Sequence, residues 1–272
     1  MIRIETEEGW ILIEHREHAR LAGRFGARWG NAEFAPPEPR PNVLAAVMRH
    51  DDAWAARDGN PFLTRQGRPS AFSSELVGSY SAFEEIDLAD YLAVRGRAAE
   101  SVAAENPYAA VIISMHTVDL LTAQADLTGL SPADLALHTA FIEAQRACQT
   151  ELVDGLVRSA EFGEAAAPDK LRTAFAFLQA CDSMSLMACV RFPRPIPLRH
   201  RHPRRDGTLT EILCTPMGDD TYRLSPNPLG EPQVVLEVPC RHVRGKTFSD
   251  VETFRSAYAA APVGAVQVRI VS

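Results

Sequence analysis

The sequence predicts an α+β protein in which a mainly helical body carries a small antiparallel β-sheet. Between residues 14 and 190, apolar residues recur every three to four positions, which is the period of an amphipathic helix. After residue 205, short β-prone segments alternate with turn residues, and the first 14 residues alternate in the same strand-like way. We therefore expect a helical domain with an N-terminal hairpin over residues 1–195. A smaller β-rich subdomain, packed on the first, is expected over residues 205–272.

Each expected element is placed by its apolar spacing and by the residues that flank it. Asn42 is a plausible N-cap, and Ser131 followed by Pro132 is typical of a helix start. The expected helices span residues 14–29, 42–59, 86–104, 107–124, 131–160, 168–190 and 249–260. The expected strands span residues 209–215, 222–224, 233–238 and 266–271, and the N-terminal hairpin can join their sheet. Residues 60–85 are expected to form a long loop over a pocket, and residues 191–205 a solvated basic linker.

Composition and charge narrow the function classes. The formal net charge of −7 argues against a nucleic-acid-binding protein, which normally carries a basic face. The five cysteines include no C-x-x-C pair, which favours free thiols in a reducing compartment. The first ten residues contain acids where a signal peptide has an apolar run, and no segment approaches 18 consecutive apolar residues. We expect a cytoplasmic protein that neither crosses nor binds a membrane.

Four of the expected helices carry polar residues within or beside their apolar stripes. These residues are His18, the pair His50 and Asp51, His116, and Asp182. Burying an unpaired imidazole or carboxylate costs several kcal/mol, so one shared polar site explains all four interruptions together. Imidazole and carboxylate ligands suit Mn, Fe, Zn or Co. The pattern therefore predicts a buried site for a divalent transition-metal ion, or for two such ions.

Each residue also has a structural alternative. A single inward histidine commonly forms a hydrogen bond in the core, and Asp51 can pair with an arginine. Asp182 is harder to explain in this way, because its helix offers no basic residue near it in the sequence. His15 ranks below His18 as a ligand, and His138 can serve a second metal. The other histidines, His200, His202 and His242, are expected at the surface.

The order of these residues resembles that of the HD superfamily of metal-dependent phosphohydrolases. The order is histidine, histidine–aspartate, aspartate, and it is carried by the segments EHARLAG, VLAAVMRHDDAW and LQACDSMSL. His116, in IISMHTVDLL, resembles the intervening histidines of the subgroup with two metals. The chain also resembles a bacterial family known only as a domain of unknown function. That resemblance rests on Trp10–Ala19 (W-x-L-I-x-x-x-x-H-A), His50–Pro61 (HD-x-x-W-x-x-x-D-x-x-P) and Ser114–His116 (S-x-H).

The resemblance to the HD superfamily implies an HD-like helical bundle and a ligand set of His18, His50, Asp51 and Asp182. It implies metal-assisted hydrolysis of a small phosphorylated, and therefore anionic, substrate. In this hypothesis Asp51 and His116 are the catalytic residues. Asp51 also orients the nucleophilic water, and His116 binds a second ion or donates a proton to the leaving group. Arginines near the site, such as Arg20, Arg49 and Arg57, are candidates for attracting the anion.

The chain departs from the HD pattern immediately after the dipeptide, where it has Asp52 and Ala53 in place of small or apolar residues and glycine. Two other functions therefore stay open. One is an HD-type di-iron oxygenase, in which His116 and His138 supply additional ligands. The other is a non-catalytic HD-like protein that binds a ligand and retains the polar residues as a hydrogen-bonded core network.

Overall fold

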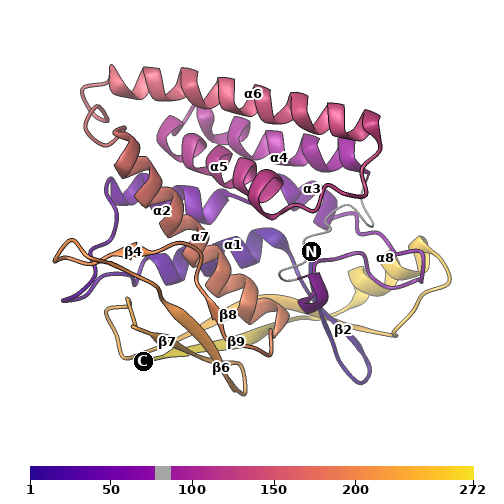
Figure 1. Ribbon diagram of the computed structural model, residues 1–272. Helices are drawn as coiled ribbons and strands as arrows, with labels where there is room; N and C mark the ends of the chain where they lie inside the picture. Colours follow the sequence, from indigo (N-terminus) through magenta and orange to yellow (C-terminus); the bar gives the residue numbers. More distant parts are fainter. Residues whose placement is uncertain (77–86) are drawn as a thin grey trace.

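The computed structural model describes residues 1–76 and 87–272, which form a mixed structure of helices and a β-sheet (Figure 1). The helices are α1 (His15–Gly26), α2 (Arg40–Arg49), α3 (Ala55–Asp58), α4 (Leu88–Ala103), α5 (Pro107–Asp119), α6 (Pro132–Val157), α7 (Pro168–Val190) and α8 (Val251–Ala260). Short 3-10 turns cover Asp52–Trp54 and Ser74–Leu76, and a π turn over Leu120–Gln124 continues α5. The helical content and the presence of a sheet confirm the predicted mixture of the two.

The strands form one seven-stranded sheet and a two-stranded ribbon within the described residues. They are β1 (Ile2–Glu5), β2 (Gly9–Ile13), β3 (Ile196–Pro197), β4 (His202–Pro203), β5 (Leu209–Thr210), β6 (Leu213–Gly218), β7 (Thr221–Ser225), β8 (Gln233–Arg244) and β9 (Val263–Val271). The large sheet has the order β1-β2-β8-β9-β7-β6-β3, and β4 pairs with β5. All neighbouring strands are antiparallel except β7 and β9, which are parallel. The N-terminal hairpin joins the sheet through β2 and β8, as the sequence suggested.

Helix α7 lies at the centre of the molecule, between the sheet and the outer helices (Figure 1). It packs against α1, α2 and α5, and α6 covers α4 and α5 on the outside. Alternate residues of β8 are buried, so one face of that strand packs into the core, as expected for a half-buried sheet. A single hydrophobic cluster contains Phe25 of α1, Leu178 of α7 and Val238 of β8.

Within residues 1–76 and 87–272, one helix is long and apolar enough to cross a membrane by length and composition. This helix is α7, and 78% of its most apolar 18-residue window is buried inside the protein. Its apolar character is therefore explained by its position in the core, where both faces of the helix contact protein.

The segment 191–205 is not the solvated linker that its prolines and arginines suggested. It contains β3 and β4, and the amide of Leu198 donates to the carbonyl oxygen of Ile212. His202, expected at the surface, is 2% exposed and packs against the ring of Trp29, with the ring centroids 5.3 Å apart. Proline prevents a helix here but not isolated strand pairing, so the segment lies against the body of the protein. The expected strand 209–215 is likewise divided into β5 and the first part of β6.

Candidate metal centre

The prediction of one continuous helix over residues 42–59 is wrong, because the helix breaks at the His50–Asp51 pair. It begins at Arg40, after Pro39, and ends at Arg49, with His50 at its C-terminal end. Asp51 leaves the helical conformation (φ −116°, ψ 12°), and a 3-10 turn follows. In a continuous helix adjacent side chains point about 100° apart. Because the helix breaks at this position, His50 Nε2 and Asp51 Oδ2 lie 3.6 Å apart and face the same site.

Helices α1, α5 and α7 bring their polar residues to the same point as the end of α2. His18 Nε2 lies 3.3 Å from Asp182 Oδ1 and 3.5 Å from Asp51 Oδ2. His50 Nε2 lies 3.3 Å from the same Asp182 oxygen, and His116 Nε2 lies 4.0 Å from Asp182 Oδ2. We call these five residues the cluster. All are buried except Asp182, whose side chain is 15% exposed. Two overlapping groups, His18–His50–Asp51 and His50–His116–Asp182, each have ligand atoms within 4.8 Å of one another.

Hydrogen bonds outside the cluster fix which nitrogen of two imidazoles carries the proton. His50 Nδ1 lies 2.8 Å from the carbonyl oxygen of Val47, which can only accept, so Nδ1 is the donor. Ser185 Oγ donates to the carbonyl oxygen of His18 and lies 3.0 Å from His18 Nδ1, so it accepts from that nitrogen. Nε2 is therefore the nitrogen of each ring that points into the cluster, where it is a lone pair when the ring is neutral and a donor when the ring is protonated. His50 Nε2 is buried, and Asp182 Oδ1, 3.3 Å away, and Asp51 Oδ2, 3.6 Å away, are the acceptors it faces.

The charges of the cluster follow from the same geometry. Burial opposes protonation of His18, but hydrogen bonds to Asp182 and Asp51 outweigh it and raise the pKa of His18 to about 9. Burial also opposes ionisation of Asp182, yet the hydrogen bonds of His18 and His50 hold its pKa far below the ordinary value. His116 differs, because burial lowers its pKa to about 3 and keeps it neutral. The cluster thus presents two carboxylates that stabilise a cation between them.

Arg95 is a functional candidate that the sequence analysis missed. Its side chain is buried, and Nη1 donates to Asp51 Oδ1 at 2.9 Å while Nε donates to the hydroxyl of Tyr91 at 3.2 Å. The guanidinium also lies over the ring of Trp54, 5.3 Å from its centroid. It occupies one oxygen of Asp51 and leaves Oδ2 directed at the histidines. The sequence could have indicated it, because Arg95 is a charged residue on the apolar face of α4, one helical turn from the buried Tyr91.

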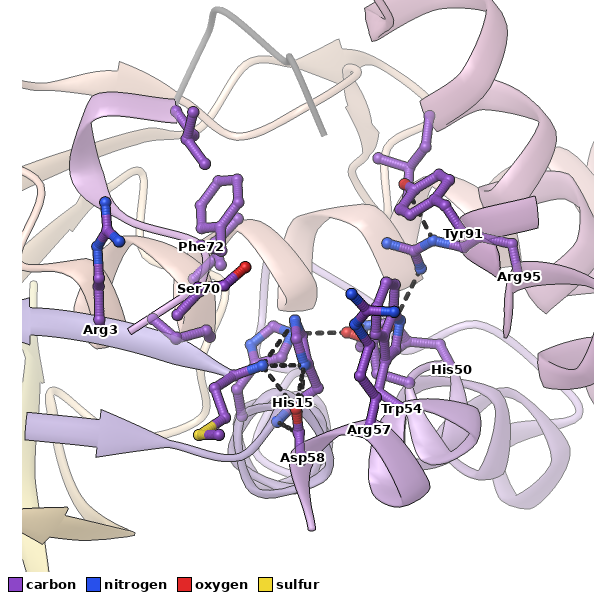
Figure 2. Close-up of a pocket in the computed structure, with 18 of the residues that line it drawn as sticks. Arg3, His15, His50, Trp54, Arg57, Asp58, Ser70, Phe72, Tyr91 and Arg95 are labelled. Carbon is purple, nitrogen blue, oxygen red and sulfur yellow. Dashed lines mark hydrogen bonds and ion pairs between the residues drawn. The ribbon is translucent and has the colours of Figure 1, made fainter. Parts of the chain in front are cut away.

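A pocket of about 370 Å³ opens above the cluster. Figure 2 shows Arg3, Ser70 and Phe72 on one side, Trp54, Arg57, Tyr91 and Arg95 on the other, and His15 and Asp58 at the base. The described part of the segment 60–85 contributes to the lining, as expected, whereas residues 77–85 of that expected loop lie outside the described residues. Of the three arginines suggested from the sequence, only Arg57 lines the pocket. The other two pair with acids elsewhere, Arg20 with Glu17 and Arg49 with Asp52 and Glu105.

The remaining histidines lie outside the cluster. His15 Nδ1 lies 3.0 Å from Asp58 Oδ1, and the ring stacks on Trp54 at the edge of the pocket. His138 Nε2 lies 2.9 Å from the carbonyl oxygen of Leu121, so the candidate for a second metal is satisfied in the core. His242 is exposed, as predicted. His200 is also exposed, but it forms a hydrogen bond to a buried glutamine.

Comparison with curated proteins and with solved structures finds no significant match. A family model does match, over residues 1–245. This range includes every residue of the cluster and of the pocket, and it ends before α8 and β9. Because the match covers most of the chain, the protein belongs to the family described as "Protein of unknown function (DUF3891)".

Proposed function

We propose that this protein is a metal-dependent hydrolase that acts on a small phosphorylated molecule at the cluster. The observation that carries the proposal is the convergence of acceptors. His18 and His50 direct Nε2 at the carboxylate oxygens of Asp51 and Asp182, at 3.3 to 3.6 Å, and every one of these atoms can bind a metal ion. When both rings are neutral, these acceptors repel one another unless a cation lies between them. A metal ion satisfies all of them at once.

The residues suited to hold the ion are His18, His50, Asp51 and Asp182. This mixture of imidazole and carboxylate suits Mn, Fe, Zn or Co. Each histidine already has the outer hydrogen bond that orients a ligating imidazole, to Ser185 and to Val47 respectively. Arg95 plays the corresponding part for Asp51. When bound, a divalent ion supplies Lewis-acid chemistry and makes water acidic enough to hydrolyse an ester near neutral pH.

The pocket supports a small anionic substrate. Arg57 lines it and has no carboxylate partner within residues 1–76 and 87–272, so its charge is available to a phosphate group. The guanidinium packs over the ring of Phe62, 5.0 Å from its centroid, which holds it near the pocket. Asp51 Oδ2 faces the metal position and is suited to orient a nucleophilic water. The volume fits a molecule of metabolite size rather than a polymer.

The order of the ligands along the chain supports an HD-like helical core as part of this proposal. Histidine from α1, histidine and aspartate from the end of α2, and aspartate from α7 follow the sequence order of that superfamily. A di-iron oxygenase needs more ligands. His50, His116 and Asp182 form a second group of suitable atoms, but His138 is bonded to the carbonyl oxygen of Leu121. A purely structural network would need protons on His18 and His50 to separate the two carboxylates, and a metal ion takes the place of both protons. Hydrolysis is therefore the favoured function.

The test is metal-dependent release of phosphate from a panel of small phosphate monoesters. We expect activity that a chelator abolishes and that Mn²⁺, Fe²⁺, Zn²⁺ or Co²⁺ restores. Asp182→Asn should reduce kcat/KM at least about a hundredfold, because the loss of one ligand weakens metal binding and transition-state stabilisation together. His138→Gln is the matched control and should retain activity, since His138 is buried outside the cluster. Hydrolysis that persists in Asp182→Asn, or in chelated protein, contradicts the proposal.

A further inference from the structure

His116 differs from the other two histidines of the cluster in what its outer nitrogen meets. The ring is buried on α5 and lies edge-on to His50, with the centroids 5.2 Å apart. Its Nδ1 faces Gln179 Nε2 of α7, at 3.5 Å. His18 and His50 meet acceptors at the equivalent position, whereas His116 meets the amide group of a glutamine. The orientation of that amide therefore decides where the proton of His116 resides.

The amide of Gln179 is held in one orientation by charged neighbours. Its Oε1 accepts from Arg199 Nε at 3.1 Å and lies 2.5 Å from His200 Nε2. Its Nε2 donates to Asp119 Oδ2 at 2.8 Å. A rotated amide would place its NH₂ group against the guanidinium and its oxygen against the carboxylate. Arginine cannot accept and a carboxylate cannot donate, so the rotated orientation loses both bonds.

The fixed amide presents an N–H group to His116. The neutral ring then accepts at Nδ1 and carries its proton on Nε2, the nitrogen that lies 4.0 Å from Asp182 Oδ2. A nitrogen that carries a proton has no lone pair for a metal ion. We propose that Gln179 is a positioning residue that makes His116 a hydrogen-bond donor to a substrate oxygen and keeps it from coordinating metal. The substrate contact rests on the proposed hydrolase function, but the tautomer does not.

Two of the residues that hold the amide of Gln179, Arg199 and His200, belong to the segment 191–205. His200 adopts a left-handed backbone conformation (φ 67°), which is uncommon for a non-glycine residue, and its ring packs on Phe175 at 5.1 Å. Arg199 Nη2 also donates to Asp119 Oδ2, at 3.1 Å, so the arginine contacts both the amide oxygen of Gln179 and the carboxylate that accepts from the amide nitrogen. A strained residue persists only where its surroundings hold it. The basic segment thus contributes to the outer side of the cluster, on the face of His116 away from Asp182.

The test is the tautomer of His116, read from long-range ¹H–¹⁵N correlations of the imidazole rings in the full-length chain, both metal-free and zinc-loaded. Wild-type His116 should carry its proton on Nε2. Gln179→Glu replaces the donor by an acceptor, so the proton should move to Nδ1. The freed Nε2 should then allow zinc content to rise from about one toward about two ions per chain. Gln145→Glu is the control, because that buried amide bonds to Ser114 and should leave His116 unchanged.

Gln179→Leu provides a second variant that introduces no buried charge. It removes the amide and should leave His116 as a mixture of both tautomers. The inference is overturned if wild-type His116 carries its proton on Nδ1, or if neither Gln179 variant alters the tautomer. Because the metal-free spectrum needs neither metal nor activity, the tautomer is decided even if the protein binds no zinc. Absence of zinc binding would instead contradict the hydrolase proposal.

Discussion

Removal of metal should make the stability of the protein depend on pH through His18. Without a metal ion, a proton on His18 is the cation that lies between Asp51 and Asp182, and its pKa is raised to about 9. The native state therefore binds His18's proton more tightly than the unfolded state, whose histidine titrates near 6.5. The contribution is fully present below pH 6.5 and is lost as the pH rises through about 9. The difference between the two pKa values corresponds to about 3 kcal/mol.

The assay is urea unfolding of chelator-treated protein at intervals between about pH 6 and pH 9.5. We expect the free energy of unfolding to fall by about 3 kcal/mol across this range. The lowered pKa values of Asp51 and Asp182 act only in the acidic range, so they do not contribute here. His50, whose pKa is also raised, adds to the same dependence. Protein loaded with metal should show little change in the free energy of unfolding over this pH range, because the metal ion replaces the proton on His18.

Two variants separate this effect from general alkaline destabilisation. His18→Asn keeps a donor near the Ser185 hydroxyl but lacks Nε2, so most of the pH dependence should disappear. His138→Gln alters a buried histidine outside the cluster and should retain it. A metal-free wild type whose stability is flat from pH 6.5 to 9.5 would refute the reasoning. So would an unchanged slope in His18→Asn.

Three further predictions concern Arg95, His202 and Cys148. Arg95→Met should lower the free energy of unfolding by about 3 kcal/mol in urea titrations, because it removes the guanidinium that pairs with Asp51 Oδ1. Asp51→Asn in the same chain should recover part of the loss, and strict additivity of the two changes would contradict the pairing. Burial lowers the pKa of His202 to about 4, so its contribution to stability is present above pH 6.5 and is lost as the pH falls through about 4. His202→Phe should reduce the loss of unfolding free energy over this acidic range, and an unchanged loss would contradict the prediction. Cys148 is the partly exposed one of the five cysteines, whereas the other four are buried. Although burial raises the pKa of its thiol, a thiol reagent should label about one site before the others in the folded protein, and Cys148→Ser should abolish that phase.

The helices could be predicted closely where their stripes are long and uninterrupted. The bounds expected for α7 agree with the structure, and those for α4 and α6 differ by one to three residues at each end. The end of α2 could not be predicted, because the break at Asp51 has no proline or glycine to mark it. The order of the strands also depends on contacts between distant segments, such as β2 with β8, that local periodicity does not contain.

Much of the cluster could be predicted, since an inward polar residue on an apolar stripe is a local signal. Arg95 is also an inward polar residue on an apolar stripe, but arginine does not bind metal ions, so a pattern of metal ligands does not select it. Gln179 and His200 could not be found in this way. A buried glutamine is chemically ordinary, and His200 follows a proline-rich segment whose position depends on long-range packing. The local pattern thus finds the residues that face the site, and the structure is needed for those that orient them.

The central claim is that the cluster holds a divalent transition-metal ion, and elemental analysis of the purified, reconstituted protein tests it most directly. Wild-type protein and His138→Gln should contain about one ion per chain, whereas Asp51→Ala and Asp182→Ala should each lose it. Circular dichroism of each variant checks that the fold is retained. Metal-free wild type after reconstitution, or a metal content unchanged in both aspartate variants, would contradict the account.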